Sequence, residues 1–342
     1  MSMRAWQVHE HGSPGDVLQQ AELPVPQPGP GELRVQVASV AIGMPDVFMC
    51  RGTYQLTPPL PFVPGQEVCG VVDAVGEGVD VAVGARVMGV TSFFDGRGGF
   101  ADSTIMYPAT AYRVPDSMSS DVAAAFRIGY STAWTGLVRR GQLQSGEWLV
   151  VLGAAGGSGM SAIQLGRALG ARVIAVAAGE EKLAFCKRLG AEVVIDRSKG
   201  SVRDAIFAAT SGRGADVIYD PVGGATAADA LQALASFGRF LVVGFASGAW
   251  LKVSGGDLTL SNRSVIGVIA HAGTPDEHVS AHETMLSLVA DGKLEPVVTT
   301  VAFDVTCVSS VGRANPNFVK SPCASHTSNR VNRRRNTLVR AR

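Results

Sequence analysis

The sequence lacks an apolar run long enough to cross a membrane, and its first residues lack the apolar stretch of a signal peptide. We therefore expect a soluble, cytoplasmic protein without a membrane partner. Charge is also scarce, because only 17% of the residues are charged while 46% are hydrophobic and 41 are glycine. This composition favours an α/β enzyme over a disordered or fibrous chain. The 342 residues are enough for two domains with sizeable cores.

Paired cysteines are missing as well. The five cysteines, at positions 50, 69, 186, 307 and 323, are odd in number and form no C-x-x-C pair. We expect buried or unreactive thiols in a reducing compartment.

One glycine-rich stretch organises the rest of the chain. An apolar run of strand length, 148–152, leads into a turn, and apolar residues then recur at helical spacing up to residue 169. Gly156 would let a pyrophosphate approach the backbone, and Gly159 would let the helix pack close to the strand. A helix N-terminus supplies N–H groups and the positive end of a dipole. We therefore expect a dinucleotide to bind at Ala154, Ala155, Gly156, Gly157, Ser158 and Gly159.

The surrounding segments predict the fold class. Five further strands, separated by helices, complete a six-stranded doubly wound parallel sheet; they are expected at 172–177, 192–195, 215–220, 239–243 and 264–269. Residues 3–120 contain short apolar runs between Pro- and Gly-rich turns, which predict an antiparallel β domain. A glycine turn that binds nothing is the alternative at 154–159, and the β-α-β-α-β context argues against it.

A missing carboxylate indicates the cofactor. NAD sites usually end the second strand with an Asp or Glu that binds the ribose 2′-hydroxyl. This strand ends Ala177-Ala178-Gly179, where a 2′-phosphate would meet no repulsion. Lys182 and Arg197 lie close enough in sequence to contact that phosphate, although ordinary solvated surface charge is the alternative for each. The pattern predicts NADPH, with Gly179, Lys182 and Arg197 at its adenosine end.

Together these features resemble the zinc-independent quinone oxidoreductases of the medium-chain dehydrogenase/reductase superfamily. The resemblance runs from about residue 3 to 300 and is strongest at 45–54, 60–67 and 129–134, with 220–224 and 296–300 in agreement. It implies an α/β protein with a Rossmann doubly wound parallel sheet and a GroES-like antiparallel β-barrel. The implied domains are the catalytic barrel at 1–122, the NADPH-binding domain at 123–270, a return to the barrel at 271–304, and an atypical tail at 305–342.

The same resemblance assigns further residues. It places Thr132 near the nicotinamide carboxamide, and Gly223, Gly244 and Phe245 at strand ends that face the cofactor. It also implies a homodimer formed through the edge strand at 264–269. Close relatives carry an Asn at the position of Gly43, so this chain lacks an amide that would contact substrate or nicotinamide.

Zinc ligands are absent from the positions where related alcohol dehydrogenases have them. Gly43, Gln66 and Ile128 stand where the resemblance would place two cysteines and a histidine, and tetrahedral zinc cannot be held by what remains. His278 and His282 are one helical turn apart, which suits a metal pair, but without a third ligand we expect an exposed helix face. We predict no metal site.

Without a metal, the chemistry requires protein donors. A hydride needs an electrophilic carbon, and the oxygen that gains charge needs a hydrogen-bond donor or a proton. Tyr54 is the leading candidate, because the corresponding tyrosine is the proposed acid in related enoyl-thioester reductases; the alternative is a tyrosine that lines the pocket. Asp46 is a second catalytic candidate, but it could equally cap a short helix begun at Pro45.

The tail departs from the family. Residues 305–342 contain eight Lys or Arg, no Asp or Glu and little periodic apolar character, so we expect disorder. A shifted reading frame is our hypothesis, since the resemblance stops where the composition changes. A family-like ending in another frame of the gene would support it, and the absence of one would refute it.

The sequence thus predicts an NADPH-dependent oxidoreductase of the NADPH:quinone reductase class (EC 1.6.5). It would transfer a hydride to a small-molecule quinone or α,β-unsaturated carbonyl without zinc. The alternatives are an enoyl-thioester reductase, an alcohol dehydrogenase, which the missing zinc ligands disfavour, or a weakly active NADPH-binding relative that uses its basic tail on nucleic acid. We do not expect nucleic acid to be a partner.

Overall fold

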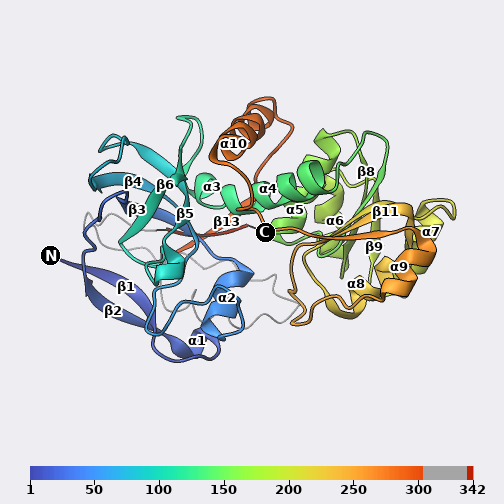
Figure 1. The fold of residues 1–342 in the computed structure, drawn as a ribbon, viewed down its shortest axis with the longest axis horizontal. Coiled ribbons are helices and arrows are strands. Elements are labelled where there is room, and N and C mark those ends of the chain that lie inside the picture. Colours follow the sequence, from blue (N-terminus) through green and yellow to red (C-terminus); the bar gives the residue numbers. More distant parts are fainter. Residues whose placement is uncertain (303–336, 342) are drawn as a thin grey trace. The chain divides into compact units, whose positions relative to one another are not determined.

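The computed structural model describes residues 1–302 and 337–341, which form two compact units (Figure 1). Unit 1 contains Met1–Arg127 and the described residues from Val298 onward, and unit 2 contains Ile128–Val297. No helix in the described part of the chain is long and apolar enough to cross a membrane. Cys50, Cys69 and Cys186 are buried free thiols, and the other two cysteines lie outside the described residues.

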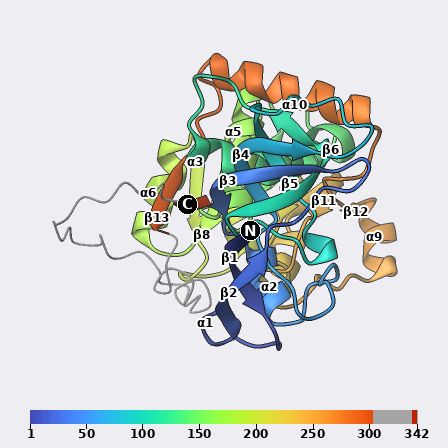
Figure 2. The same ribbon diagram turned by 90° about the vertical axis from the view of Figure 1, so that its left-hand side faces the viewer.

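Unit 1 is built on an antiparallel barrel. Strand β3 pairs with β4, β4 with β5 and β5 with β6, and β6 returns to pair with β3 (Figure 2). A separate hairpin, β1 with β2, packs its apolar side chains into the same core. The strands are β1 (Ser2–Val8), β2 (Leu18–Pro24), β3 (Leu33–Ala41), β4 (Glu67–Val75), β5 (Arg86–Thr91) and β6 (Ser103–Arg113). The helices are α1 (Pro14–Val17), α2 (Met44–Cys50) and α3 (Ser120–Ala124).

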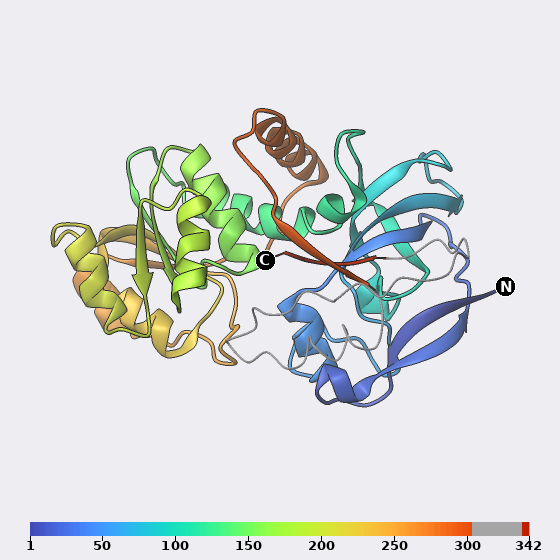
Figure 3. The same ribbon diagram turned by 180° about the vertical axis from the view of Figure 1, so that it is seen from behind.

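The end of the chain adds two strands to this unit, β13 (Val298–Ala302) and β14 (Thr337–Ala341). Strand β14 pairs parallel with β3 and antiparallel with β13 (Figure 3). The predicted disorder of 305–342 is therefore wrong for 337–341, while 303–336 and residue 342 lie outside the described residues. Backbone pairing explains the difference. The edge of β3 has backbone N–H and C=O groups that can pair with any extended segment, and Thr-Leu-Val has a high strand propensity.

Unit 2 contains the predicted parallel sheet, with strand order β12-β11-β10-β7-β8-β9. Helices α5 and α6 pack on β7, β8 and β9, while α7 packs with α8 beside β9, β10 and β11 (Figure 1). The strands are β7 (Trp148–Val151), β8 (Arg172–Ala177), β9 (Val193–Asp196), β10 (Ala215–Asp220), β11 (Leu234–Val242) and β12 (Ser264–Gly267). The helices are α4 (Arg127–Trp134), continued by a π-helical turn at Thr135–Arg140, α5 (Gly157–Ala168), α6 (Glu180–Arg188), α7 (Val202–Ala209), α8 (Gly224–Leu231), α9 (Gly255–Ser261) and α10 (Pro275–Ala290).

The return to unit 1 begins at Val298, later than the predicted residue 271. Helix α10 starts at a capping box formed by Thr274 and Glu277, with Pro275 in its first turn. Beyond this helix, Glu295 is held to α5, since its backbone N–H donates to Gln164 Oε1 and its carbonyl accepts from Gln164 Nε2 at 2.9 Å. These bonds attach residues 271–297 to unit 2, a long-range contact that the local pattern does not contain.

Candidate functional site

The turn between β7 and α5 has the geometry that a dinucleotide needs. Gly156 is the N-cap of α5, and Ala154 is fully buried beneath the turn. A Cβ added at Gly159 would lie 2.5 Å from the Gly153 carbonyl oxygen and 2.7 Å from Ala154 Cα, so only glycine lets the helix approach this closely. The first-turn amides of a 12-residue helix therefore stand beside an exposed bend.

The turn lies at the point where the order of the strands reverses. Strand β7 has β8 on one side and β10 on the other, because the chain builds β8 and β9 first and then crosses back over β7 to build β10. Ligands of open parallel sheets bind in the crevice at such a point. The Leu152 N–H donates to the Tyr219 carbonyl at 3.0 Å, and Ser158 Oγ lies 2.8 Å from the buried Tyr219 hydroxyl. Burial raises the pKa of Tyr219, so its hydroxyl stays protonated.

Asp220, at the end of β10, organises the neighbouring loop. Its Oδ1 accepts the N–H groups of Val222 at 2.8 Å and Gly223 at 2.9 Å, and its carbonyl accepts from Gly244 at 3.2 Å. Its Oδ2 is buried and has no partner among the described residues. The predicted Gly223, Gly244 and Phe245 are thereby gathered at the carboxyl end of the sheet, where the Phe245 ring packs against Trp250. Asp220 itself was not predicted, because its burial depends on three segments that are distant in sequence.

Burial raises the pKa of Asp220 from 3.8 to about 6, which makes the stability of the fold depend on pH. The folded protein binds more protons than the unfolded chain between these two values, so the free energy of unfolding should fall as pH rises through that window, by up to about 3 kcal/mol. Asp220→Asn should lose this part of the slope in urea unfolding at pH 4 and pH 7. Asp291→Asn, at an exposed carboxylate, should keep it. Equal slopes for wild type and Asp220→Asn would contradict the assignment.

The carboxyl ends of β8 and β9 contain the residues that the sequence predicts for the adenosine end of the cofactor, and one residue that the sequence analysis missed. The Arg197 N–H donates to the Ala177 carbonyl at 2.9 Å, which brings the ends of β8 and β9 together. Gly179, at φ +89°, is exposed and begins α6, and Lys182 follows in its first turn. The Asp196 carboxylate accepts hydrogen bonds from the backbone of Gly179 and from Ser198, whose hydroxyl is 2.6 Å away, and these bonds lower its pKa. The carboxylate that the end of β8 lacks is therefore present beside Gly179, but it belongs to the last residue of β9.

Thr132 lies on α4, close to the start of α5. One turn earlier on α4, a Cβ added at Gly129 would lie 2.8 Å from Ser161 Oγ, so the two helices are in contact there. The Thr132 hydroxyl donates to the Ile128 carbonyl of its own helix at 2.7 Å.

Unit 1 contains a separate polar cluster around Asp46. The Asp46 carboxylate is buried and accepts the N–H groups of Gly43 at 2.8 Å and Gly65 at 3.0 Å, as well as the backbone of Gln66. Burial raises its pKa to about 6. Asp46 therefore caps α2, the second of the two roles that the sequence left open, and ties α2 to the segment before β4.

Tyr54 belongs to the same cluster. Its ring packs partly buried against the barrel core, and the Gln66 side chain lies beside its hydroxyl. Burial raises the pKa of Tyr54, and the Gln66 side chain acts in the opposite direction. The phenol is therefore protonated at neutral pH and able to donate.

Among residues 1–302 and 337–341, no group of three or more His, Cys, Asp or Glu side chains could hold a metal ion. The expected exposed face at His278 and His282 is wrong, since His278 is half-buried and His282 is buried in α10. Burial follows from what α10 packs against, which helical spacing does not reveal.

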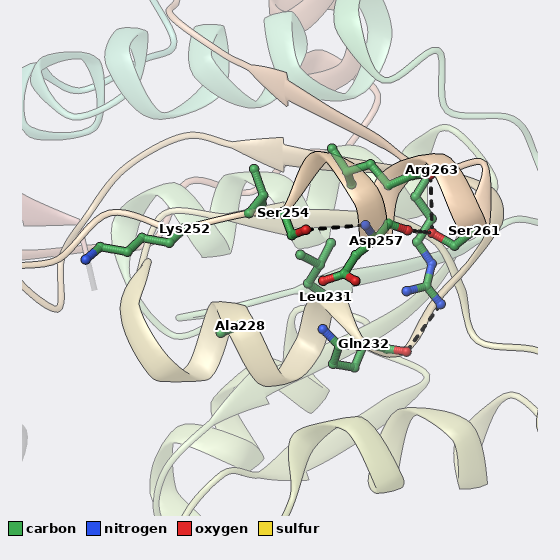
Figure 4. Close-up of a pocket in the computed structure, with 10 residues that line it drawn as sticks. Ala228, Leu231, Gln232, Lys252, Ser254, Asp257, Ser261 and Arg263 are labelled. Carbon is green, nitrogen blue, oxygen red and sulfur yellow. Dashed lines mark hydrogen bonds between the residues drawn. The ribbon is translucent and has the colours of Figure 1, made fainter.

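A small surface pocket of unit 2 lies away from the turn between β7 and α5. Residues of α8 and α9 line it, and within it Arg263 donates to the Gln232 carbonyl at 3.3 Å (Figure 4). Gln232 and Arg263 precede β11 and β12, so the pocket lies at the amino ends of strands whose carboxyl ends form the site above.

Comparisons with known proteins support both units. Residues 29–116 match the family model described as alcohol dehydrogenase GroES-like domain, and residues 157–290 match the one described as zinc-binding dehydrogenase. The chain is 33% identical to a quinone oxidoreductase-like protein 2 homolog of Nematostella vectensis, over 90% of this chain and 84% of the relative. A mycobacterial protein solved in complex with NADPH is 29% identical, with a TM-score of 0.82 over 91% of this chain and 95% of that one. A quinone oxidoreductase of Pseudomonas syringae is 28% identical, with a TM-score of 0.81 over 92% and 97% of the two chains.

Proposed function

This chain belongs to the quinone oxidoreductase family of the medium-chain dehydrogenase/reductase superfamily, and we propose that it is an NADPH-dependent reductase of quinones or α,β-unsaturated carbonyls. As a member of that family it is a nicotinamide-dependent oxidoreductase. The observation that carries the proposal is the turn that contains Gly156 and Gly159, because at Gly159 the helix lies too close to the backbone of Gly153 and Ala154 for any side chain.

The residues of the chain have separable roles in this reaction. The first turn of α5 binds the pyrophosphate through backbone N–H groups, without needing a cationic side chain. The loops after β10 and β11 hold Gly223, Gly244 and Phe245 at the end of the sheet where the nicotinamide belongs. The bound nicotinamide supplies a hydride for an electrophilic carbon of the acceptor. Tyr54 then donates a hydrogen bond or a proton to the oxygen that becomes negative.

We propose that the reaction uses no zinc. Gly43 and Ile128 carry no ligand atom in their side chains, and the Gln66 amide is a poor substitute for imidazole or thiolate. Turnover should therefore be unchanged after dialysis against a chelator, and restoration of lost turnover by added zinc would contradict this.

The central experiment measures oxidation of NADPH and of NADH with a small quinone, an enone and an enoyl thioester. We expect turnover with the quinone or the enone, and faster turnover with NADPH than with NADH. Turnover with the thioester alone would identify an enoyl-thioester reductase. No turnover with any acceptor, together with calorimetry that shows no binding of either nucleotide, would refute the proposal.

Asp196 should weaken the preference for NADPH, because its carboxylate lies beside the Gly179 backbone, close in the fold to where we propose that Lys182 and Arg197 contact the 2′-phosphate. Asp196→Asn should tighten binding of NADPH about two- to fivefold, the range for exposed charges, and leave that of NADH nearly unchanged. Glu192→Gln, at the amino end of the same strand, is the matched control and should change neither Kd. Equal gains for both nucleotides would show that Asp196 does not face the 2′-position.

We also propose a homodimer formed through β12. This strand is the outer edge of the parallel sheet, and Leu260 and Ile269 near it are exposed. The mass from light scattering should be twice that of the chain, and Ile269→Lys should shift it toward the monomer. A monomeric wild type would contradict this proposal.

A further inference from the structure

The hydroxyl of Tyr219 is buried against the first turn of α5. Tyr219 is fully buried, and the one side-chain hydrogen bond that it makes among the described residues joins its hydroxyl to Ser158 Oγ at 2.8 Å. Ser158 is the second residue of α5 and is only half-buried. The pair therefore links a hydroxyl in the core of unit 2 to a hydroxyl in the turn where we propose that the cofactor binds.

The proton in this hydrogen bond belongs to Tyr219. The neutral phenol has one O–H, and Ser158 Oγ is the one acceptor within hydrogen-bond distance of it in the described part of the chain. If Ser158 donated instead, the phenol O–H would be buried without an acceptor, which is rare and costly. The bond opposes the effect of burial on the pKa of Tyr219, because an ionised phenol could only accept from Ser158, but burial keeps the phenol neutral.

The Tyr219 hydroxyl is held in one place. Strand β10 is paired on both sides, since Tyr219 lies opposite Val151 of β7 and Leu241 of β11. A Cβ added at Gly136 would lie 3.0 Å from Tyr219 Cε2, so the π-helical turn at Thr135–Arg140 packs closely against the ring. A fixed phenol that donates to Ser158 Oγ also fixes the orientation of the Ser158 side chain.

This contact places Ser158 Oγ on one side of the turn. Strand β7 lies between β8 and β10 in the sheet. The residues predicted for the adenosine end lie at β8 and β9, whereas the loops that we propose for the nicotinamide follow β10 and β11. Because Ser158 Oγ is bonded to a residue of β10, it lies on the side of the nicotinamide. A serine hydroxyl that accepts from a phenol keeps its own proton for another acceptor.

We propose that Tyr219 is a positioning residue that makes the Ser158 hydroxyl a donor to the nicotinamide half of the cofactor. The acceptor is an oxygen of the carboxamide or of the adjacent ribose. Tyr219 occupies a lone pair of Ser158 Oγ, so the Ser158 O–H is already directed away from the core when the cofactor binds, and less ordering is needed at that moment. This inference rests on the proposed function and adds to it a residue that does not touch the cofactor.

The test is a double-mutant cycle on binding. The variants are Ser158→Ala, Tyr219→Phe and the double variant, and calorimetry measures the Kd of each for NADPH and for adenosine 2′,5′-bisphosphate. The second ligand has no nicotinamide half, so its Kd also shows whether the adenosine end of a variant is intact. Tyr107→Phe is the matched control, because it removes a phenol hydroxyl that donates to Asp95 in unit 1. The fluorescence of bound NADPH reports the surroundings of the nicotinamide.

We expect the Kd for NADPH to rise about three- to tenfold in Ser158→Ala, the range for one hydrogen bond. In Tyr219→Phe it should rise about two- to fivefold, because Ser158 keeps its hydroxyl but loses its fixed orientation. The double variant should bind NADPH no more weakly than Ser158→Ala, since Tyr219 acts through Ser158. The Kd for adenosine 2′,5′-bisphosphate should not change in any variant. The emission of bound NADPH should shift in both single variants and remain unchanged in Tyr107→Phe.

Three results would overturn the inference. These are a wild-type Kd for NADPH in Ser158→Ala, an equal loss of both ligands in Tyr219→Phe, or a further loss of NADPH when Tyr219→Phe is added to Ser158→Ala. A wild-type protein that binds NADPH but reduces no acceptor would refute the proposed reaction alone, and the cycle would still decide the role of Tyr219. A wild-type protein that does not bind NADPH would overturn both.

Discussion

Gly159→Ala should abolish useful binding of the nicotinamide cofactor, with an expected rise in the Kd for NADPH of about 100-fold or more. The added methyl group would lie 2.5 Å from the Gly153 carbonyl oxygen and 2.7 Å from Ala154 Cα, distances that real Cβ atoms do not reach. Both neighbours are backbone, so the helix must move away from the turn. The first-turn amides would then no longer face the pyrophosphate, and each hydrogen bond to a charged group that is lost costs about 1.5–3 kcal/mol of binding free energy. Calorimetry with NADPH measures the loss.

Two controls separate this effect from general damage. Gly255→Ala places its methyl group in open space at the start of α9 and should leave the Kd unchanged. Gly156→Ala meets only the Gly153 carbonyl oxygen, at 3.3 Å, so the turn should survive. Weak binding by that variant would come from contact with the pyrophosphate itself. Wild-type affinity in Gly159→Ala would show that the cofactor does not use this turn.

Asp46→Ala should lower the free energy of unfolding by about 3–6 kcal/mol, because three backbone amides of unit 1 would lose their acceptor in a buried place. The carboxylate joins the start of α2 to Gly65 and Gln66, which precede β4. Its removal should therefore loosen both segments together. Urea unfolding at pH 7 measures the change.

Asp46→Asn is the informative companion, because it keeps one acceptor oxygen and the size of the side chain. Its loss of unfolding free energy should be clearly smaller than that of Asp46→Ala, since the remaining amide oxygen can still accept from the backbone. Asp73→Ala removes an exposed ion pair with Arg34 in the same unit and should cost less than about 1 kcal/mol. If Asp46→Ala were equally mild, its hydrogen bonds would not hold the unit together.

The residue pattern was sufficient to predict the turn at residues 154–159 and the parallel sheet around it. Spacing of small residues at 154, 156 and 159 depends on local sterics, and alternation of apolar runs with helices specifies a doubly wound sheet. The predicted strands 172–177 and 215–220 coincide with β8 and β10. The antiparallel domain was also recognisable, because short strands between turns follow from local periodicity.

The polar partners of the site could not be predicted in the same way. Asp196 was overlooked because the sequence drew attention to the end of β8, whereas its carboxylate reaches Gly179 from the neighbouring strand. Asp46 remained ambiguous until its three amides were seen, and Gln66 was considered only as a missing zinc ligand. The closing strand at 337–341 was missed because its pairing with β3 depends on backbone hydrogen bonds rather than on side-chain pattern.

The sequence by itself determined the turn and the doubly wound sheet, because these depend on the spacing of residues along the chain, and its motifs carried the resemblance to the family. Only the tertiary structure decided which polar groups are buried, which hydroxyl Ser158 contacts and where the last strand pairs. The physical reason is that burial and hydrogen bonding depend on which distant segments meet, and no local pattern encodes that meeting.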